Sequence, residues 1–132
     1  YFNQKFFRVF VRNSAKKIRY FMTFLYACEF NDISTTKPKK IIVDDCDLLA
    51  VKTLDEQVWI FDYFCTHSDK PLEHGKWNPE TGHLLCPFHK AIFAIKESGK
   101  VLAPPASVAL KVYSTQIQIA DGEKKVFVDL NS

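Results

Sequence analysis

The sequence lacks several patterns that would identify a common functional class. No apolar run is long enough to span a bilayer, and the first residues show neither the plain apolar stretch nor the small-residue cleavage site of a signal peptide. Four glycines among 132 residues form no glycine-rich phosphate loop, and no nucleophile stands in a recognisable pattern with a general base. We therefore expect no transmembrane segment and no site for nucleophilic or phosphate-transfer chemistry.

Short strand-like segments separated by turns dominate the sequence after its first two dozen residues. Apolar segments over residues 40–44, 48–52 and 57–61 predict three strands, and Asp55-Glu56 predicts a tight hairpin turn between the last two. Residues 116–119 alternate glutamine with isoleucine, which predicts a strand with one inner and one outer face. With no long helical period and a length that suits one domain, the chain is predicted to be an all-β sandwich or barrel.

Acidic side chains are absent from the first 21 residues, which instead carry six basic ones: Lys5, Arg8, Arg12, Lys16, Lys17 and Arg19. Alternation around residues 8–12 predicts a strand, and Ser14 is a candidate N-cap for a helix over residues 14–20. We expect residues 1–21 to be a basic, aromatic N-terminal extension that packs as an edge element. The alternative is an arm that docks on an acidic partner or a membrane surface; nucleic-acid binding has no other support.

Two pairs of cysteine and histidine are the strongest chemical signal in the chain. Cys65-Thr66-His67 is followed, after eighteen residues, by Cys86-Pro87-Phe88-His89. Each pair is short enough to lie in one loop, so two loops would offer two sulfur and two nitrogen ligands. Zinc accepts such a set, and so does a two-iron, two-sulfide cluster in which two histidines replace two cysteines on one iron. Zinc motifs more commonly place two cysteines close together and two histidines close together, so the mixed cysteine–histidine pairs favour the cluster.

The residues around these ligands resemble the Rieske iron–sulfur family. The shared features are Cys-x-His with Pro71-Leu72 shortly after it, Cys-Pro-x-His with Phe93 shortly after it, and the later Ala103-Pro104-Pro105. The resemblance covers roughly residues 22–131, so we expect residues 22–132 to form one Rieske domain. It implies a Rieske-like antiparallel sandwich or barrel with an inserted cluster-binding subdomain at about residues 63–106, in which the proline segment covers the cluster as a third loop.

The same resemblance implies a cofactor and the ligands that hold it. The cofactor would be a [2Fe-2S] cluster. Cys65 and Cys86 would bind the buried ferric iron through sulfur, while His67 and His89 would bind the outer iron, which takes the electron. Imidazole is a neutral ligand, and this places Rieske potentials at roughly −150 to +300 mV, above those of all-cysteine plant-type clusters.

The function that the resemblance implies is that of a soluble Rieske-type ferredoxin, a one-electron carrier and not itself an enzyme. Its partner would dock on the loop tips around Pro71, Lys90 and Pro104, and a redox protein such as a reductase or an oxygenase would serve as donor or acceptor. Two alternatives are an electron-transfer subunit of an oxygenase or nitrite reductase system, and a zinc-stabilised binding module. Oxygenases of this family hold a mononuclear iron in a second domain, and no such ligand set is present here.

Several positions depart from the family pattern. Lys70 and Phe88 stand where respiratory-complex members have a disulfide, and Ala91 and Phe93 stand where those members have hydrogen-bonding serine and tyrosine hydroxyls. A hydrogen bond to a charged group is worth about 1.5–3 kcal/mol, and about 1.4 kcal/mol is ~59 mV for one electron. Because only the part that differs between redox states counts, losing two donors lowers the potential by on the order of 100 mV. We therefore expect a reduction potential in the low-to-middle part of the Rieske range. The positive charges of Lys70 and Lys90 act in the opposite direction and raise it. A measured potential near +300 mV would contradict the expectation.

Other residues of the same types have simpler interpretations. Cys28 and Cys46 lie in strand-like segments and are expected to be buried thiols rather than a disulfide. His74 and His83 are expected to be loop histidines in contact with water. Thiolate ligands and unpaired cysteines suit a reducing compartment, so a cytoplasmic location is expected.

Overall fold

The structure is a computed structural model that describes residues 6–13, 18–88, 90–104 and 106–132. These residues contain eleven strands, two short 3-10 helices and no α-helix, so the all-β prediction is confirmed. The strands are β1 (Phe6–Asn13), β2 (Ile18–Glu29), β3 (Lys39–Val43), β4 (Cys46–Lys52), β5 (Val58–Asp62), β6 (Lys76–Asn78), β7 (His83–Leu85), β8 (Ile92–Ala94), β9 (Lys100–Ala103), β10 (Val112–Ala120) and β11 (Glu123–Asp129). The 3-10 helices are η1 (Phe30–Asp32) and η2 (Ile95–Glu97). Within the described ranges, no helix has the length and apolar character to cross a membrane.

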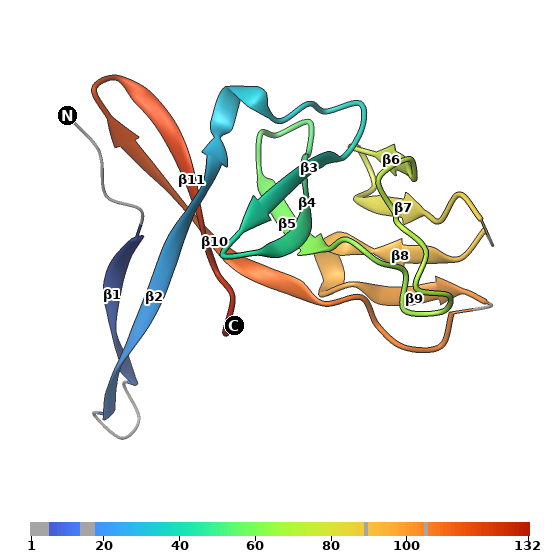
Figure 1. Ribbon diagram of the computed structural model, residues 1–132, viewed down its shortest axis with the longest axis horizontal. Coiled ribbons are helices and arrows are strands. Elements are labelled where there is room, and N and C mark those ends of the chain that lie inside the picture. Colours follow the sequence, from blue (N-terminus) through green and yellow to red (C-terminus); the bar gives the residue numbers. More distant parts are fainter. Residues whose placement is uncertain (1–5, 14–17, 89, 105) are drawn as a thin grey trace.

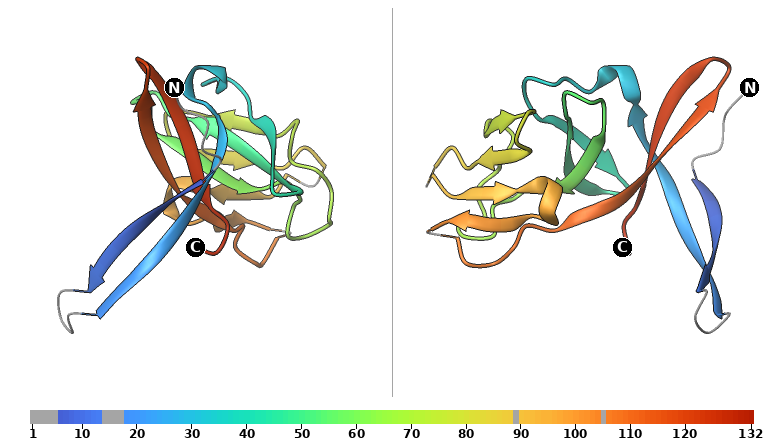
Figure 2. Two further views of the ribbon diagram at one scale, coloured as in Figure 1. Left: turned by 60° about the vertical axis from the view of Figure 1, so that its left-hand side comes forward. Right: turned by 180° about the vertical axis from the view of Figure 1, so that it is seen from behind.

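The strands form two antiparallel sheets (Figure 1). The large sheet has seven strands in the order β1-β2-β11-β10-β5-β4-β3, and the small sheet has four in the order β6-β7-β8-β9. In the chain, the small sheet lies between β5 and β10, which are neighbours in the large sheet. The loops of the small sheet therefore gather at one end of the molecule, opposite the end where β1 and β2 project (Figures 1 and 2).

Strand β4 is the shared wall of two hydrophobic cores. Residues 48–52 are buried one after another, because the strand is covered on both faces. Leu49 and Val51 belong to the core beneath the small sheet, and Leu48 and Ala50 belong to the core formed with β2, β3 and β11. Burying a leucine side chain completely stabilises the fold by about 1.5–3 kcal/mol. The first of these cores is the one that supports the paired Cys-His loops.

The N-terminal hairpin forms the edge of the large sheet. Strand β1 pairs antiparallel with β2, from Phe6 opposite Leu25 to Asn13 opposite Ile18, and β2 joins the hairpin to β11. The strand and the edge position were predicted, but the helix is wrong for Ile18 to Tyr20, which begin β2; residues 14–17 lie outside the described residues. Pairing along a long strand outweighed a weak local helix signal. β1 and the first part of β2 project beyond the remaining strands of the large sheet and away from the small sheet (Figures 1 and 2).

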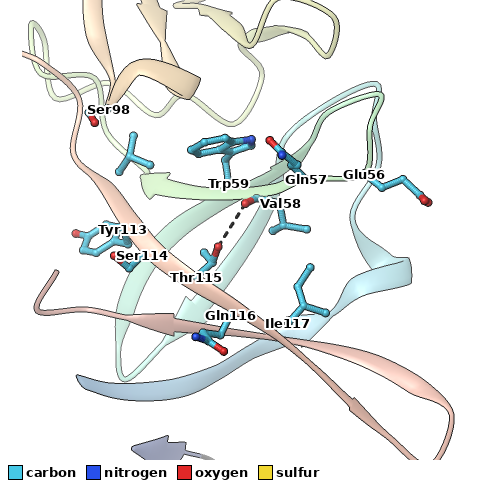
Figure 3. A pocket seen from close by; sticks show the side chains of 11 residues that line it. Glu56, Gln57, Val58, Trp59, Ser98, Tyr113, Ser114, Thr115, Gln116 and Ile117 are labelled. Atoms are coloured by element: carbon cyan, nitrogen blue, oxygen red, sulfur yellow. Dashed lines mark hydrogen bonds between the residues drawn. The ribbon is translucent and has the colours of Figure 1, made fainter. Parts of the chain in front are cut away.

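Strand β10 corrects a second prediction. Ile117 and Ile119 do not form an inner face, since their side chains are 41% and 70% exposed. Strand β10 pairs with β5 only at Val112 and Tyr113 and then continues with β11 alone. Beyond Tyr113, β10 and β5 diverge around an open hollow of about 660 Å³ (Figure 3). Across it, Thr115 donates a hydrogen bond to the Val58 carbonyl at 3.4 Å. Both isoleucines are exposed, so alternation alone did not identify a buried face.

Candidate metal centre

Two loops at the end of the small sheet have the same backbone geometry. In the first loop (residues 65–70), the Cys65 N–H donates to the Lys70 carbonyl at 2.8 Å, and the Asp69 N–H donates to the Cys65 carbonyl at 3.1 Å. In the second loop (residues 86–91), the Cys86 N–H donates to the Ala91 carbonyl at 2.8 Å, and the Lys90 N–H donates to the Cys86 carbonyl at 3.2 Å. Each cysteine therefore starts a closed turn of the same size, as two loops that hold one centre require.

Both turns close through a residue with a left-handed backbone. The φ angle is +54° at Asp69 and +59° at Lys90, although neither residue is glycine. An L-residue pays a steric cost in this region that glycine avoids, although aspartate tolerates it better than lysine does. The loops thus keep the glycine-type conformation without glycine.

Replacing Lys90 by glycine is expected to stabilise the protein. Relief of left-handed strain (about 1–2 kcal/mol) exceeds the added freedom of the unfolded chain (about 0.5–1 kcal/mol), so the net gain is about 0.5–1 kcal/mol. Thermal unfolding followed by circular dichroism should show a melting temperature higher by a few degrees, with a smaller gain for Asp69→Gly. Lys70→Gly is the control, because Lys70 is not among the residues with positive φ, and it should lower the melting temperature. A lower melting temperature for Lys90→Gly would show that the Lys90 side chain stabilises the fold by more than the left-handed backbone destabilises it.

The two loops bring Cys65 and Cys86 together. Both side chains are only 1% exposed and belong to the core beneath the small sheet, and neither forms a disulfide. Burial raises the pKa of the Cys65 thiol, the backbone N–H of His67 lowers it, and a hydrogen bond with the neighbouring Cys86 thiol raises it. Burial thus favours the neutral thiol, while the backbone N–H favours the thiolate. A metal bound between the two sulfurs would stabilise the thiolate, because metals bind that form.

The histidines are placed differently from the cysteines. His67 is exposed on the same loop as the buried Cys65, and His89 lies outside the described residues. Among the residues that the structure describes, no three side chains of the metal-binding types are grouped closely enough to hold an ion. The structure thus brings the two predicted sulfur ligands together, and the histidine ligands stay predictions. His74 is exposed and His83 is partly buried in β7.

A third segment and a set of polar contacts hold the loops in place. Thr66 Oγ1 donates to the Val108 carbonyl at 2.7 Å, which ties the first loop to the segment between β9 and β10. At the base of the first loop, Tyr63 Oη donates to Glu73 Oε1 at 2.7 Å. Lys70 Nζ lies 5.6 Å from the centroid of the Phe88 ring and so connects the two loops. These contacts were not predicted from the sequence, although Thr66 lies inside the first motif.

Comparison with known proteins identifies the family. A model of the Rieske [2Fe-2S] domain matches residues 23–114, which is more than half of the chain. The chain belongs to the Rieske [2Fe-2S] family. It is 27% identical over 100 residues to the biphenyl dioxygenase ferredoxin subunit of Pseudomonas sp. (strain KKS102), covering 76% of this chain and 89% of that protein. A Sphingomonas yanoikuyae B1 ferredoxin superposes with a TM-score of 0.67 and 26% identity, over 80% of this chain and 97% of its own.

A further Rieske structure is a complex of reduced oxygenase and oxidized ferredoxin in carbazole 1,9a-dioxygenase. One of its chains superposes with a TM-score of 0.63 and 24% identity, over 80% of this chain and 92% of the matched chain. The family match, together with the two ferredoxins at 26–27% identity, confirms the prediction of an electron carrier with a [2Fe-2S] cluster, rather than an enzyme or a zinc-stabilised module. They also confirm the Rieske-like fold predicted from the two motifs.

The described residues fit such a cluster. Two buried thiols lie in contact at the end of the core, and the backbone N–H groups of His67 and Ser68 both point to the Cys65 sulfur. The Ser68 hydroxyl is buried and has no hydrogen-bond partner among the described residues. Hydrogen bonds from a protein to the sulfur atoms of an iron–sulfur cluster are one of the means that set its potential. This surrounding of donors therefore suits anionic sulfur better than a neutral thiol pair.

Proposed function

We propose that this Rieske ferredoxin carries one electron at a time to a larger oxidoreductase, with Cys65 and Cys86 on the inner iron and His67 and His89 on the outer one. The observation that carries this assignment is the contrast within the first loop, where Cys65 is buried and His67 is exposed. When bound, the cluster supplies a one-electron couple whose potential depends on hydrogen bonds and solvent. The cysteines hold the cluster at the core. The histidine side faces the surface, where an electron can pass to a bound partner over a short distance.

The face around the two loops supports docking of a protein partner. Its exposed apolar side chains are Phe64, Phe88, Leu102 and Val108, with exposed fractions of 46%, 53%, 43% and 61%. Pro104 and the side chains of Lys70 and Lys90 are exposed among them. Interfaces combine a fully desolvated apolar centre with a polar rim, so this face has the composition of a contact surface. The partner would cover the loop tips and so approach the outer ligands.

The relatives suggest which kind of partner this is. One is the ferredoxin subunit of a biphenyl dioxygenase, and another structure pairs a ferredoxin with an oxygenase. By analogy, we assign to this chain a reductase as donor and an oxygenase as acceptor. In this arrangement residues 63–106 form the cluster-binding subdomain, residues 22–132 form the Rieske domain, and residues 1–21 are an extension to it.

Electron paramagnetic resonance on the purified protein, before and after dithionite, tests the proposed function. We expect a signal only after reduction, with the low average g value of a histidine-ligated two-iron cluster, together with two irons per chain by metal analysis. An average g value of an all-cysteine cluster would contradict the ligand assignment, while zinc without iron would contradict the electron carrier itself.

Replacing Phe88 and Val108 by serine is expected to slow electron transfer to the oxygenase partner about tenfold. Fewer than about a third of interface residues cost more than 1 kcal/mol when they are truncated. We therefore expect the two changes together to cost about 1.4 kcal/mol, which is tenfold. Stopped-flow oxidation of the reduced ferredoxin by the copurified partner would measure this rate. Ile119→Ser is the matched control, because Ile119 is 70% exposed but lies on the part of β10 that pairs with β11. Equal rates for wild type, the Phe88→Ser/Val108→Ser double variant and Ile119→Ser would exclude this face as the docking surface.

The cysteine outside the core gives some information on the compartment. Cys28 is buried as predicted, but Cys46 is exposed, because it lies at the start of β4 after the Asp44-Asp45 turn. Neither is part of a disulfide. An exposed unpaired thiol is more stable where the surroundings are reducing, which supports a cytoplasmic location. Cell fractionation with a periplasmic or organelle marker enzyme would test it, and co-release with that marker would contradict it.

A further inference from the structure

Ser68 presents a buried hydroxyl that the rest of the described structure does not use. Its Oγ is inaccessible to solvent and has no hydrogen-bond partner among the described residues; the indole Nε1 of Trp59 is the other such atom there. Leaving a buried hydroxyl unpaired costs about 1–3 kcal/mol, and buried polar groups in native proteins are almost always paired. The hydroxyl therefore needs an acceptor or donor that the described residues do not supply.

The position of Ser68 shows where that partner lies. Ser68 follows His67 in the first loop, and its own backbone N–H reaches the sulfur of Cys65. Cys65 in turn contacts Cys86, so Ser68 stands beside the two sulfurs that anchor the cluster. The loop is closed here by the bond from the Asp69 N–H to the Cys65 carbonyl. Within this closed turn, the Ser68 Oγ is inaccessible to solvent.

We propose that the Ser68 hydroxyl donates a hydrogen bond to anionic sulfur of the centre, either the Cys65 thiolate or a cluster sulfide, and so raises its reduction potential. This inference rests on the proposed function, because the acceptor exists only when the cluster is bound. A serine hydroxyl can donate one hydrogen bond and orients its hydrogen freely. Reduction adds negative charge to the sulfurs, so a donor aimed at them stabilises the reduced state more than the oxidised state.

The second loop makes this donor more important. Ala91 and Phe93 are fully buried in the core beside Cys86, and their side chains cannot donate a hydrogen bond. Thr66 has a hydroxyl in the first loop, but it donates to the Val108 carbonyl. Ser68 is therefore the side-chain hydroxyl of the two loops, as far as they are described, that remains available to the cluster.

The test compares the holo forms of wild type, Ser68→Ala and Ser68→Thr. Potentiometric titration monitored by electron paramagnetic resonance gives the reduction potential. Ser68→Ala should lower the equilibrium constant for reduction about tenfold, which for one electron is about 59 mV. Ser68→Thr keeps the hydroxyl and should stay within about twofold of wild type. Ser107→Ala is the control for the chemical change, because Ser107 is exposed in the segment between β9 and β10, and it should leave the potential unchanged.

A second readout separates a hydrogen bond from a general effect on the loop. Electron–nuclear double resonance of the reduced cluster, recorded in H₂O and D₂O, detects exchangeable protons near the irons. Ser68→Ala should lose one exchangeable coupling that wild type and Ser68→Thr retain. An unchanged potential and an unchanged set of couplings in Ser68→Ala would overturn the inference while the cluster signal itself still supports the proposed function. Absence of the signal in wild type would overturn both.

Discussion

Replacing Cys86 by alanine is expected to abolish the visible absorption and the reduced-state paramagnetic signal of the cluster. Cys86 is 1% exposed and contacts the Cys65 thiol at the end of the core. In the proposed ligand set Cys86 supplies a thiolate to the inner iron, and alanine offers no ligand. The side chain loses only its sulfur, so the strands around it should still form. Far-ultraviolet circular dichroism should therefore retain its β-sheet signal while iron analysis falls to background.

The chain supplies its own cysteine control for this experiment. Cys46 is exposed at the start of β4 and lies apart from the two loops. Cys46→Ala should therefore keep the full iron content and the unchanged spectrum. Loss of the cluster in Cys46→Ala, or its retention in Cys86→Ala, would mean that the sulfur ligands have been assigned to the wrong residues.

The histidine ligands can be tested in the same way. His67→Ala and His89→Ala should each lose the low average g value that imidazole ligands confer, with loss of most of the cluster. His74→Ala provides the matched control, because His74 is exposed between the two loops. His83 lies in β7, and His83→Ala should also keep the spectrum. A Rieske-type signal that survives His89→Ala would refute the ligand set, and one lost in His74→Ala would place that residue in it.

The features of this fold that could be predicted from sequence are those that depend on local patterns. Continuous apolar residues at 48–51 predicted a strand, and the structure explains them by burial on both faces of β4. The two Cys-His motifs predicted loops at strand ends, because short spacing confines both side chains of each pair to one turn.

The features that could not be predicted depend on what covers a strand or faces a side chain. Ile117 and Ile119 alternate as a buried face would, but β10 pairs only with β11 at these positions, and both side chains are exposed. The helix signal after Ser14 was overridden from Ile18 onward by pairing in β2. The unpaired hydroxyl of Ser68 follows only from three-dimensional packing, since no sequence pattern distinguishes it from an ordinary loop serine.

Replacing Gly99 by alanine is expected to destabilise the protein by about 3–5 kcal/mol. Gly99 has a φ angle of +73°, and an added Cβ would lie 1.8 Å from the Leu110 carbonyl oxygen. Left-handed strain contributes about 1–2 kcal/mol, and forcing a packed neighbour aside typically costs another 1–3 kcal/mol or more. The neighbour is backbone, and Leu110 is itself fully buried and donates its N–H to the Gly99 carbonyl at 2.9 Å. No side-chain rotation can therefore relieve the contact.

Gly122→Ala separates the clash from the strain. Gly122 has a similar φ angle of +79°, but nothing lies within 4 Å of its added Cβ, so the expected cost is about 1–2 kcal/mol from conformation alone. In thermal unfolding of the holo proteins, Gly99→Ala should lower the melting temperature by on the order of 10–20 °C and Gly122→Ala by only a few degrees. Because Leu110 shares a core with Cys65 and Cys86, Gly99→Ala should also reduce iron retention. Equal effects of the two substitutions would show that the backbone at Leu110 moves to accommodate the added methyl group. The core that contains Leu110, Cys65 and Cys86 would then be less rigid than its burial indicates.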